Sequence, residues 1–288
     1  MLRSTIDTTI AILITCFNRR ELTLACLEKL YVQDLPFEVY LTDDGSTDGT
    51  LAAVEAHYPA VKILHGNGNL FWGGGTRLAF AEAFKANYDY YIWLNDDTLL
   101  KPNALSVLLN AHQQLIQQGK PNSIVVGSMQ DPITKQTSYG GFSKYSWRPL
   151  KFRLIDPTQT IQECQTINGN LVLIPRSVAE IVGNLDPALP HMMGDFDYGL
   201  RAIELGCSIY IAPGYLGTCP RNSLQNTWMD TNLSLKQRLQ KFKFKGSSFL
   251  RPDSWVYAKR HGGTLWLLHW LRPYIQFVYI SLFGKRSL

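Results

Sequence analysis

Four short apolar runs recur through the N-terminal third of the chain, and each is followed by a polar cluster and a helical pattern. The runs cover residues 9–15, 37–41, 61–64 and 90–94. Their β-branched and aromatic residues are typical of strands buried in a parallel sheet. Apolar positions at helical spacing follow within residues 22–31, 51–57, 76–86 and 102–118. This alternation predicts an α/β fold with a mostly parallel sheet flanked by helices.

The second half alternates less regularly. Strands are predicted at residues 124–129, 170–174 and 207–212, and helices at 175–182 and 196–205. Three prolines and an adjacent glycine pair separate the first two of these strands, so that stretch is expected to be rich in loops. We find no internal repeat. We therefore predict one domain over residues 1–225 and a basic, amphipathic, helical extension over residues 226–288.

Charge is distributed unevenly along the chain. Residues 1–235 hold 17 Lys and Arg against 22 Asp and Glu, whereas residues 236–288 hold 11 against 1. Such a basic end on an acidic body predicts an anionic partner for that end. Nucleic acid is disfavoured because no DNA- or RNA-binding motif accompanies the charge.

The last apolar run, residues 265–283, is aromatic and carries one narrow polar stripe of His269, Arg272 and Gln276, with Pro273 interrupting it. A membrane span needs about 20 clean apolar residues. The run therefore predicts a pair of interfacial helices on an anionic membrane surface. The alternatives are a helix that covers the domain core, or a homodimer interface.

The five cysteines show no paired spacing, and no export or spanning segment is found at the N-terminus. These features predict free thiols in a reducing compartment. We expect a cytoplasmic protein, peripheral on the inner face of the membrane.

Polar clusters follow the predicted strands where ligands bind in open α/β sheets. The first strand leads into Thr15, Asn18 and Arg19, the second into Asp43 and Asp44, and the fourth into Asn95, Asp96 and Asp97. Each acidic pair alone suits a turn or a helix cap. Two acidic pairs at one edge indicate a site for Mg²⁺ or Mn²⁺ bound to a diphosphate. Asp43 also suits an acceptor for a base imide or a ribose hydroxyl.

A glycine-rich segment, residues 66–75, follows the third strand and includes Gly74, with Arg77 just beyond. We predict a loop whose backbone approaches a ligand, and a phosphate contact from Arg77. The segment breaks the G-x-G-x-x-G pattern at Phe71 and follows the wrong strand for a dinucleotide fingerprint, so a dehydrogenase is rejected.

The segment HMMGDFDYGLRA places Asp195 and Asp197 at a helix start. Acidic residues there can simply match the helix dipole, and for Asp197 that reading is as good as a functional one. Asp195 is our candidate for the carboxylate that deprotonates an acceptor hydroxyl.

Together these segments resemble the family 2 glycosyltransferases of the GT-A fold, over about residues 9–215. ILITCFNRRELTLACLEKL is similar to that family's first strand and helix, and LTDDGSTDGT to its V-D-D-G-S-x-D-x-T signature. WLNDDT resembles the D-x-D region, and GDFDYGLRA the E-D-x-D helix start. GNGNLFWGGGTRLAF is most similar to a rhamnosyltransferase-like subset.

The resemblance implies a role for each matched position. Thr15, Asn18 and Arg19 would lie near the nucleotide, Asp43 would hold the base, and Asp44 would lie near the ribose or support its loop. Asp96 would lie beside the ribose or diphosphate, Asp97 would be the main metal ligand, and Asp195 the catalytic base. Three positions depart from the family pattern. Asn95 replaces the first D-x-D carboxylate, Gly194 replaces the usual Glu, and no late His occurs near Cys219, for which His191 is a replacement candidate.

We therefore expect an inverting glycosyltransferase that uses dTDP-rhamnose or a UDP-sugar and a polysaccharide or lipid-linked glycan acceptor. A sugar nucleotidyltransferase is the second enzymatic hypothesis, although its glycine-rich loop after the first strand is missing. A catalytically weak, nucleotide-binding family member is the third.

Overall fold

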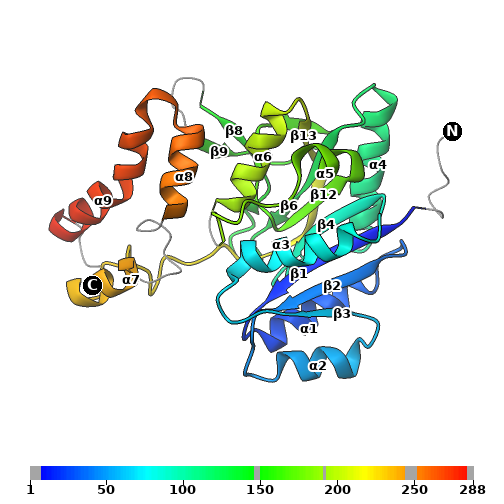
Figure 1. The fold of residues 1–288 in the computed structure, drawn as a ribbon, viewed down its shortest axis with the longest axis horizontal. Coiled ribbons are helices and arrows are strands. Elements are labelled where there is room, and N and C mark those ends of the chain that lie inside the picture. Colours follow the sequence, from blue (N-terminus) through cyan, green and yellow to red (C-terminus); the bar gives the residue numbers. More distant parts are fainter. Residues whose placement is uncertain (1–7, 146–149, 191–192, 244–251, 284–288) are drawn as a thin grey trace.

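The computed structural model describes residues 8–145, 150–190, 193–243 and 252–283, and it confirms the α/β fold (Figure 1). The strands of the large sheet are β1 (Ile10–Cys16), β2 (Glu38–Asp43), β3 (Lys62–His65), β4 (Tyr90–Asn95), β5 (Leu99–Leu100), β6 (Ser123–Gln130), β7 (Thr137–Tyr139), β10 (Gln162–Cys164), β12 (Leu171–Pro175) and β13 (Ser208–Thr218). Their order is β10-β13-β6-β12-β4-β1-β2-β3, with β5 paired to β13 and β7 to β6.

Parallel pairing dominates the part of the sheet that the sequence pattern predicted. β1 pairs in parallel with β2 and β4, and β2 with β3. β6 and β13 are also parallel, but β12 runs antiparallel between β4 and β6. The carboxyl ends of β1, β2 and β4 therefore lie together at one edge.

Six helices cover the two faces of the sheet. α1 (Arg20–Leu30), α2 (Thr50–His57) and α4 (Ala104–Gln117) pack on one face, and α3 (Phe71–Phe84), α5 (Arg176–Val182) and α6 (Gly194–Glu204) on the other. β1 shows how one strand serves both layers. Ile12 and Ile14 belong to the first core and Ala11 and Leu13 to the second, because successive side chains of a strand point to opposite faces.

The stretch predicted as loops contains a second, small sheet. Its strands are β8 (Gly141–Lys144), β9 (Phe152–Leu154) and β11 (Thr166–Ile167), in the order β11-β8-β9. They are antiparallel and at most four residues long. Runs this short carry too little alternation to be distinguished from loop sequence.

The C-terminal extension is helical, as predicted, and lies beside α6 (Figure 1). It comprises α7 (Leu235–Lys243), α8 (Pro252–His261), the 3₁₀ turn η3 (Gly263–Leu265) and α9 (Trp266–Phe283). The prediction of a helix pair broken by Pro273 is wrong, since α9 runs through this residue. Proline removes one N–H donor and its ring crowds the carbonyl four residues back, but its φ is helix-compatible, so a long helix can continue past it.

Aromatic contacts join α9 to α7 and to the segment before α7. The Phe242 ring centroid lies 4.6 Å from that of Phe277 and 5.7 Å from that of Tyr274. Trp228, in the segment before α7, packs against Phe277 of α9 with ring centroids 6.1 Å apart, and edge-on against Phe242 with centroids 5.2 Å apart. These contacts hold α9 in place but leave most of its surface uncovered.

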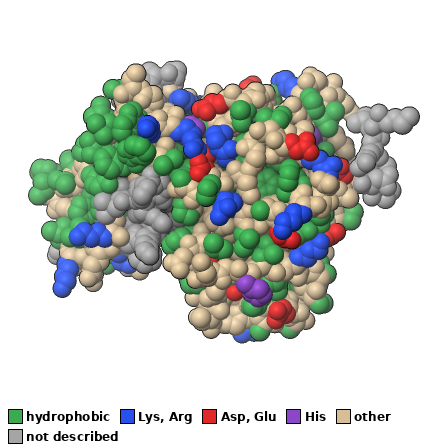
Figure 2. Space-filling model, viewed as in Figure 1, with side chains coloured by type: hydrophobic (Ala, Val, Ile, Leu, Met, Phe, Trp, Pro, Cys, Tyr) green, Lys and Arg blue, Asp and Glu red, His purple; other side chains and the backbone are tan. Residues whose placement is uncertain are grey.

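No residue of α9 is buried. Its outward side chains include Leu268, Ile275, Tyr279 and Leu282, which are 59%, 62%, 62% and 69% exposed. Their spacing of seven, four and three residues places them along one side of the helix. Figure 2 shows hydrophobic side chains gathered over this end of the molecule. Among the described residues, no helix is long and apolar enough to cross a membrane.

Candidate active site

The carboxyl edge of β1, β2 and β4 opens into a cavity of about 550 Å³. In the register of these strands, Thr15 of β1 lies beside Thr42 of β2 and Asn95 of β4. The predicted site residues divide into those at this cavity and those outside its lining. Those that line the cavity are Thr15, Arg19, Asp44, Asp96, Asp97 and Asp195, and those that do not are Asn18, Asp43, Gly74 and Arg77.

Asp44 shapes the turn at the rim of the cavity. Its Oδ1 accepts a hydrogen bond from the Gly68 backbone N–H, and its Oδ2 accepts from the N–H groups of Leu70 and Phe71, all at 2.9 Å. This buried carboxylate therefore satisfies free donors at the start of α3, as a capping side chain does. Phe71 has φ +54°, a left-handed conformation that a bulky residue adopts only where its surroundings impose it. Of the two roles that the resemblance implied for Asp44, the geometry favours support of the loop.

Asp43 and Asn18 organise the loops behind the cavity wall. Asp43 is buried, and its Oδ2 accepts from the Ser46 N–H at 3.1 Å. Asn18 Oδ1 accepts from the Thr47 N–H at 2.7 Å, so this side chain holds the loop after β2 and does not cap the following helix. α1 begins after Arg19 without a side-chain cap, because the amide is already used by the neighbouring loop. A base contact from Asp43 stays a prediction.

The second half of the glycine-rich segment predicted as a loop, residues 71–75, is the first part of α3. Gly75 lies so close to β1 that a Cβ there would overlap the Thr15 side chain, and a Cβ at Gly74 would lie 3.2 Å from that of Leu70. These glycines thus allow α3 to pack tightly on the protein itself. Arg77 is exposed on α3, away from the cavity. The sequence missed the helix start because glycine has low helix propensity, while the capping carboxylate comes from a distant residue.

The carboxylates of Asp96 and Asp97 follow β4 and both face the guanidinium of Arg19. Arg19 Nη1 lies 3.0 Å from Asp96 Oδ1 and 2.9 Å from Asp97 Oδ2. The other Asp96 oxygen, Oδ2, is buried and has no hydrogen-bond partner among the described residues. Burial raises the pKa of Asp96 to about 6, against the lowering effect of Arg19. Arg19 therefore compensates the negative charge of the Asp96 carboxylate only in part.

These carboxylates fit a hard divalent cation whose other ligands are diphosphate and water oxygens. Asp97 Oδ1 also lies 3.5 Å from Cys219 Sγ. Cys219 lies in the part of the chain where the family pattern has a late His. Burial, together with the Asp97 charge, raises the pKa of this thiol to about 12, so it stays protonated. Among the described residues, no group of three or more His, Cys, Asp or Glu could hold a metal alone. His191 lies outside the described residues.

Asp195 lies at the start of α6 and at the cavity wall. It accepts hydrogen bonds from the Phe196 N–H at 2.8 Å and the Gly169 N–H at 3.0 Å. Burial nevertheless raises its pKa above 3.8. A fixed carboxylate of raised basicity at the edge of a cavity has the properties that a general base needs.

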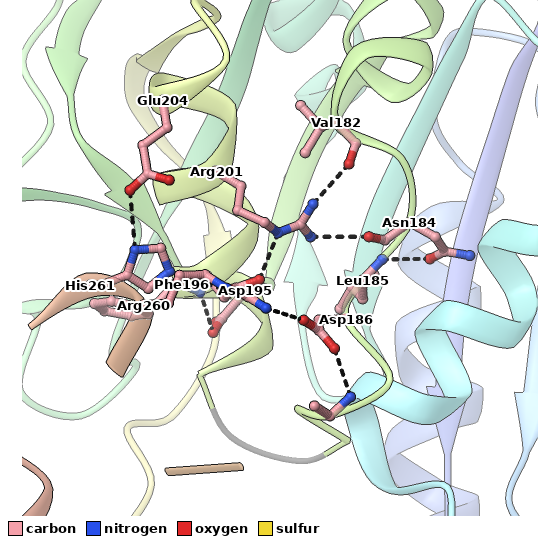
Figure 3. A network of polar contacts seen from close by, with 12 residues as sticks. Val182, Asn184, Leu185, Asp186, Asp195, Phe196, Arg201, Glu204, Arg260 and His261 are labelled. Atoms are coloured by element: carbon pink, nitrogen blue, oxygen red, sulfur yellow. Dashed lines mark hydrogen bonds and ion pairs between the residues drawn. The ribbon is translucent and has the colours of Figure 1, made fainter. Parts of the chain in front are cut away.

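Asp197 is fully buried and serves a different purpose. Burial opposes its ionisation, but hydrogen bonds from His261 and Arg201 outweigh that effect and lower its pKa. Arg201 Nε, Arg260 Nη1 and His261 Nε2 lie 2.7, 2.5 and 2.9 Å from its oxygens. Figure 3 shows Arg260 and His261 reaching from α8 toward α6. Asp197 therefore joins the C-terminal helices to the domain.

Sequence reasoning missed several cavity residues, namely Trp72, Tyr139, Asn168, Gly169 and Phe196. Most of these come from loops and short strands of the second half, which carry no periodic signal. Trp72 did have a signal, since it lies within the segment most similar to the rhamnosyltransferase-like subset.

Comparisons with known proteins agree on one family. A family profile described as "Glycosyl transferase family 2" matches residues 11–181. Two relatives named N-acetylglucosaminyl-diphospho-decaprenol L-rhamnosyltransferase, from Mycobacterium tuberculosis strains CDC 1551 / Oshkosh and ATCC 25618 / H37Rv, are each 25% identical over 199 residues. The match covers 61% of this chain and 64% of each relative, so the chain spans less than two thirds of their length.

Solved structures show the fold. S. aureus TarS 1–349 in complex with UDP-GlcNAc has a TM-score of 0.57 at 12% identity, over 96% of this chain and 76% of that chain. The mannosyltransferase PcManGT from Pyrobaculum calidifontis, in complex with GDP-Man and Mn²⁺, has a TM-score of 0.54 at 15% identity, over 96% and 88%. GalNAc-T7 with UDP, GalNAc and Mn²⁺ has a TM-score of 0.55 at 14% identity, over 72% and 42%. These glycosyltransferases share the α/β architecture described above.

Proposed function

The chain belongs to glycosyl transferase family 2, and we propose that it is an inverting, nucleotide-sugar-dependent glycosyltransferase. One observation carries the proposal: a single cavity is lined by Asp195, a carboxylate with a raised pKa, and by the Asp96–Asp97 pair with its Arg19 counter-charge. A transfer with inversion needs a base for the acceptor and compensation of the leaving group's charge. The family match favours this reaction over nucleotidyl transfer.

In the proposed reaction Asp195 accepts the proton of an acceptor hydroxyl. That oxygen forms a bond to the anomeric carbon of the donor sugar, and the bond between this carbon and the diphosphate oxygen breaks. The nucleoside diphosphate departs with the bonding electron pair, and the configuration at the anomeric carbon inverts. Arg19 lies where it can pair with the diphosphate, because its guanidinium is half exposed beside the acidic pair.

We assign Asp97, with Asp96 beside it, as the residues that would hold Mg²⁺ or Mn²⁺. When bound, such an ion neutralises negative charge on the diphosphate. The unpaired Asp96 oxygen supports this assignment, as do the Mn²⁺ complexes of fold neighbours.

For the substrates, we propose dTDP-rhamnose as the first donor to test, then UDP-sugars, with a lipid-linked GlcNAc diphosphate as acceptor. The names of the two mycobacterial relatives motivate this order. The same acceptor class fits a protein whose α9 presents apolar side chains. We further propose that α9 and the basic extension that carries it rest on the cytoplasmic surface of an anionic membrane, since apolar side chains beside cations suit that interface.

The test is an assay with dTDP-rhamnose, UDP-GlcNAc, UDP-glucose and GDP-mannose, Mn²⁺, and a short-chain polyprenyl-diphospho-GlcNAc. We expect one donor to release nucleoside diphosphate and to yield a glycoside whose anomeric configuration, measured by NMR, is opposite to that of the donor. A retained configuration would overturn the assigned mechanism, and neither hydrolysis nor transfer from any donor would contradict the enzymatic function.

A further inference from the structure

Trp72 is carried to the cavity by the turn that Asp44 holds. The hydrogen bonds from Leu70 and Phe71 to the Asp44 carboxylate fix the two residues before it. Trp72 then stands in the first turn of α3 and lines the cavity. Its position thus follows from the acidic signature at the end of β2.

The indole of Trp72 fills a space bounded by two glycines. A Cβ at Gly169 would overlap its six-membered ring, and a Cβ at Gly194 would lie 3.8 Å from its Cζ3. Below it, Trp93 packs edge-on with ring centroids 5.9 Å apart and an interplanar angle of 84°. Gly194 stands where the family pattern has Glu, and a Cβ there would lie closer to the Leu189 carbonyl oxygen, at 3.1 Å, than to the indole, so the backbone as well as the ring limits the space at this position.

The same indole also contacts the residue at the second departure. Trp72 Nε1 donates to Asn95 Oδ1 at 2.7 Å, which fixes the orientation of the amide. Asn95 Nδ2 then has no hydrogen-bond partner among the described residues, and Asn95 lines the cavity. An amide here supplies a donor, whereas the Asp of the family pattern would only accept when ionised.

Trp72 bridges the two ends of the proposed reaction. Through Asn95 it adjoins Asp96 and Asp97, and through Gly169, whose N–H binds Asp195, it adjoins the base. The sugar that is transferred must lie between the diphosphate and the acceptor hydroxyl. We propose that the pyranose ring of the donor sugar packs on the Trp72 indole and accepts a hydrogen bond from Asn95 Nδ2, an inference that rests on the proposed function.

The test separates sugar binding from nucleotide binding. Calorimetry on the full chain with Mn²⁺ and no acceptor compares dTDP with dTDP-rhamnose, UDP with UDP-GlcNAc, and GDP with GDP-mannose. In the pair whose sugar conjugate binds more tightly to wild type, Trp72→Leu should leave the nucleoside diphosphate Kd within about twofold. It should weaken the sugar conjugate roughly two- to tenfold, as expected for loss of an aromatic contact. Asn95→Ala should act in the same direction without removing the ring.

Trp93→Phe is the matched control, because Trp93 is buried beneath Trp72 and does not line the cavity. It should change neither Kd. Equal weakening of both ligands by Trp72→Leu and Asn95→Ala would overturn the proposal in favour of a structural role, as would unchanged binding by both variants. If wild type binds a nucleoside diphosphate but gains nothing from its sugar, this inference fails alone. If it binds none of the six ligands, the proposed function fails as well.

Discussion

β1 and α9 are both apolar, yet they meet their surroundings in opposite ways. Six of the seven residues of β1 are buried, whereas α9 buries none of its 18. The strand is covered by helices on both faces. The helix is held along one side by Phe242 and Trp228 and is open on the other.

This difference separates two kinds of hydrophobic sequence. Apolar side chains of the catalytic domain stabilise the fold that positions the cavity, while those of α9 are available to a partner. The catalytic domain and the C-terminal extension meet at Asp197, where α8 of the extension binds α6 of the domain. Variants should therefore fall into three classes, which affect transfer, stability or surface binding.

The largest effect is expected at the metal position. Asp97→Ala removes the carboxylate assigned as the main ligand, so transfer should fall by about 10⁴-fold, since a bound ion contributes several kcal/mol of charge stabilisation. Chelation of wild type should do the same, and Mn²⁺ should restore wild type only. Calorimetric titration with Mn²⁺ provides a readout independent of activity. Full activity in excess chelator would leave Asp96 and Asp97 as an Arg19 ion-pair site.

The base should come next. Asp195→Asn keeps the size of the side chain but removes the proton acceptor, and turnover should fall by about 10²–10⁴-fold with little change in donor Kd. Because the pKa of Asp195 is raised, kcat/KM of wild type should decline with falling pH at values above 3.8. An unchanged turnover in Asp195→Asn would place the base elsewhere and make His191 the next candidate.

Asp197→Asn should act on stability rather than on chemistry. The carboxylate is buried against three cationic or ionisable partners, so its loss should lower the free energy of unfolding by roughly 3–5 kcal/mol. The pKa of Asp197 is lowered, so its contribution is present above the unfolded value near 3.8 and is lost as pH falls through the lower folded value. Urea denaturation at pH 7 and at pH 5 should show the same deficit.

The exposed ion pair Lys85–Glu82 gives the control for that experiment. Both side chains are substantially exposed, and Glu82→Gln should change stability by less than about 1 kcal/mol. Equal effects of Glu82→Gln and Asp197→Asn would remove the distinction between a surface pair and the junction of the two regions.

The smallest effect is expected on α9. Ile275→Glu places a charge on its open side, and binding to phosphatidylglycerol vesicles should weaken roughly tenfold while hydrolysis of soluble donor is unchanged. Ile133→Glu is the matched control, because Ile133 is 86% exposed but lies between β6 and β7 of the catalytic domain. Sedimentation tests the alternative, since a dimer that dissociates in Ile275→Glu alone would identify a second copy as the partner.

The sequence was sufficient to predict structural features that depend on residues close together in the chain. The four short apolar runs predicted β1 to β4, and the polar residues after them predicted the edge where Thr15, Asp44 and Asp97 meet. Contacts between distant segments were beyond its reach. The start of α3 depends on Asp44, 26 residues before the Leu70 N–H that it binds. Similarly, the sequence did not predict the ion pairs of Asp197, because its partners Arg260 and His261 come from the extension.

The number of residues between Asp197 and those partners also determines how long after Asp197 the partners are synthesised. Arg260 and His261 follow Asp197 by 63 and 64 residues. At ribosomal speeds of 5–20 residues per second, that interval lasts roughly 3–13 s. During this interval the sheet can assemble. Of Arg201, Arg260 and His261, only Arg201 is then available to pair with Asp197. The helix that carries Asp195, the proposed base, therefore receives its last support only after α8 has been made, so a nascent chain gains its sheet before its proposed active site is secured.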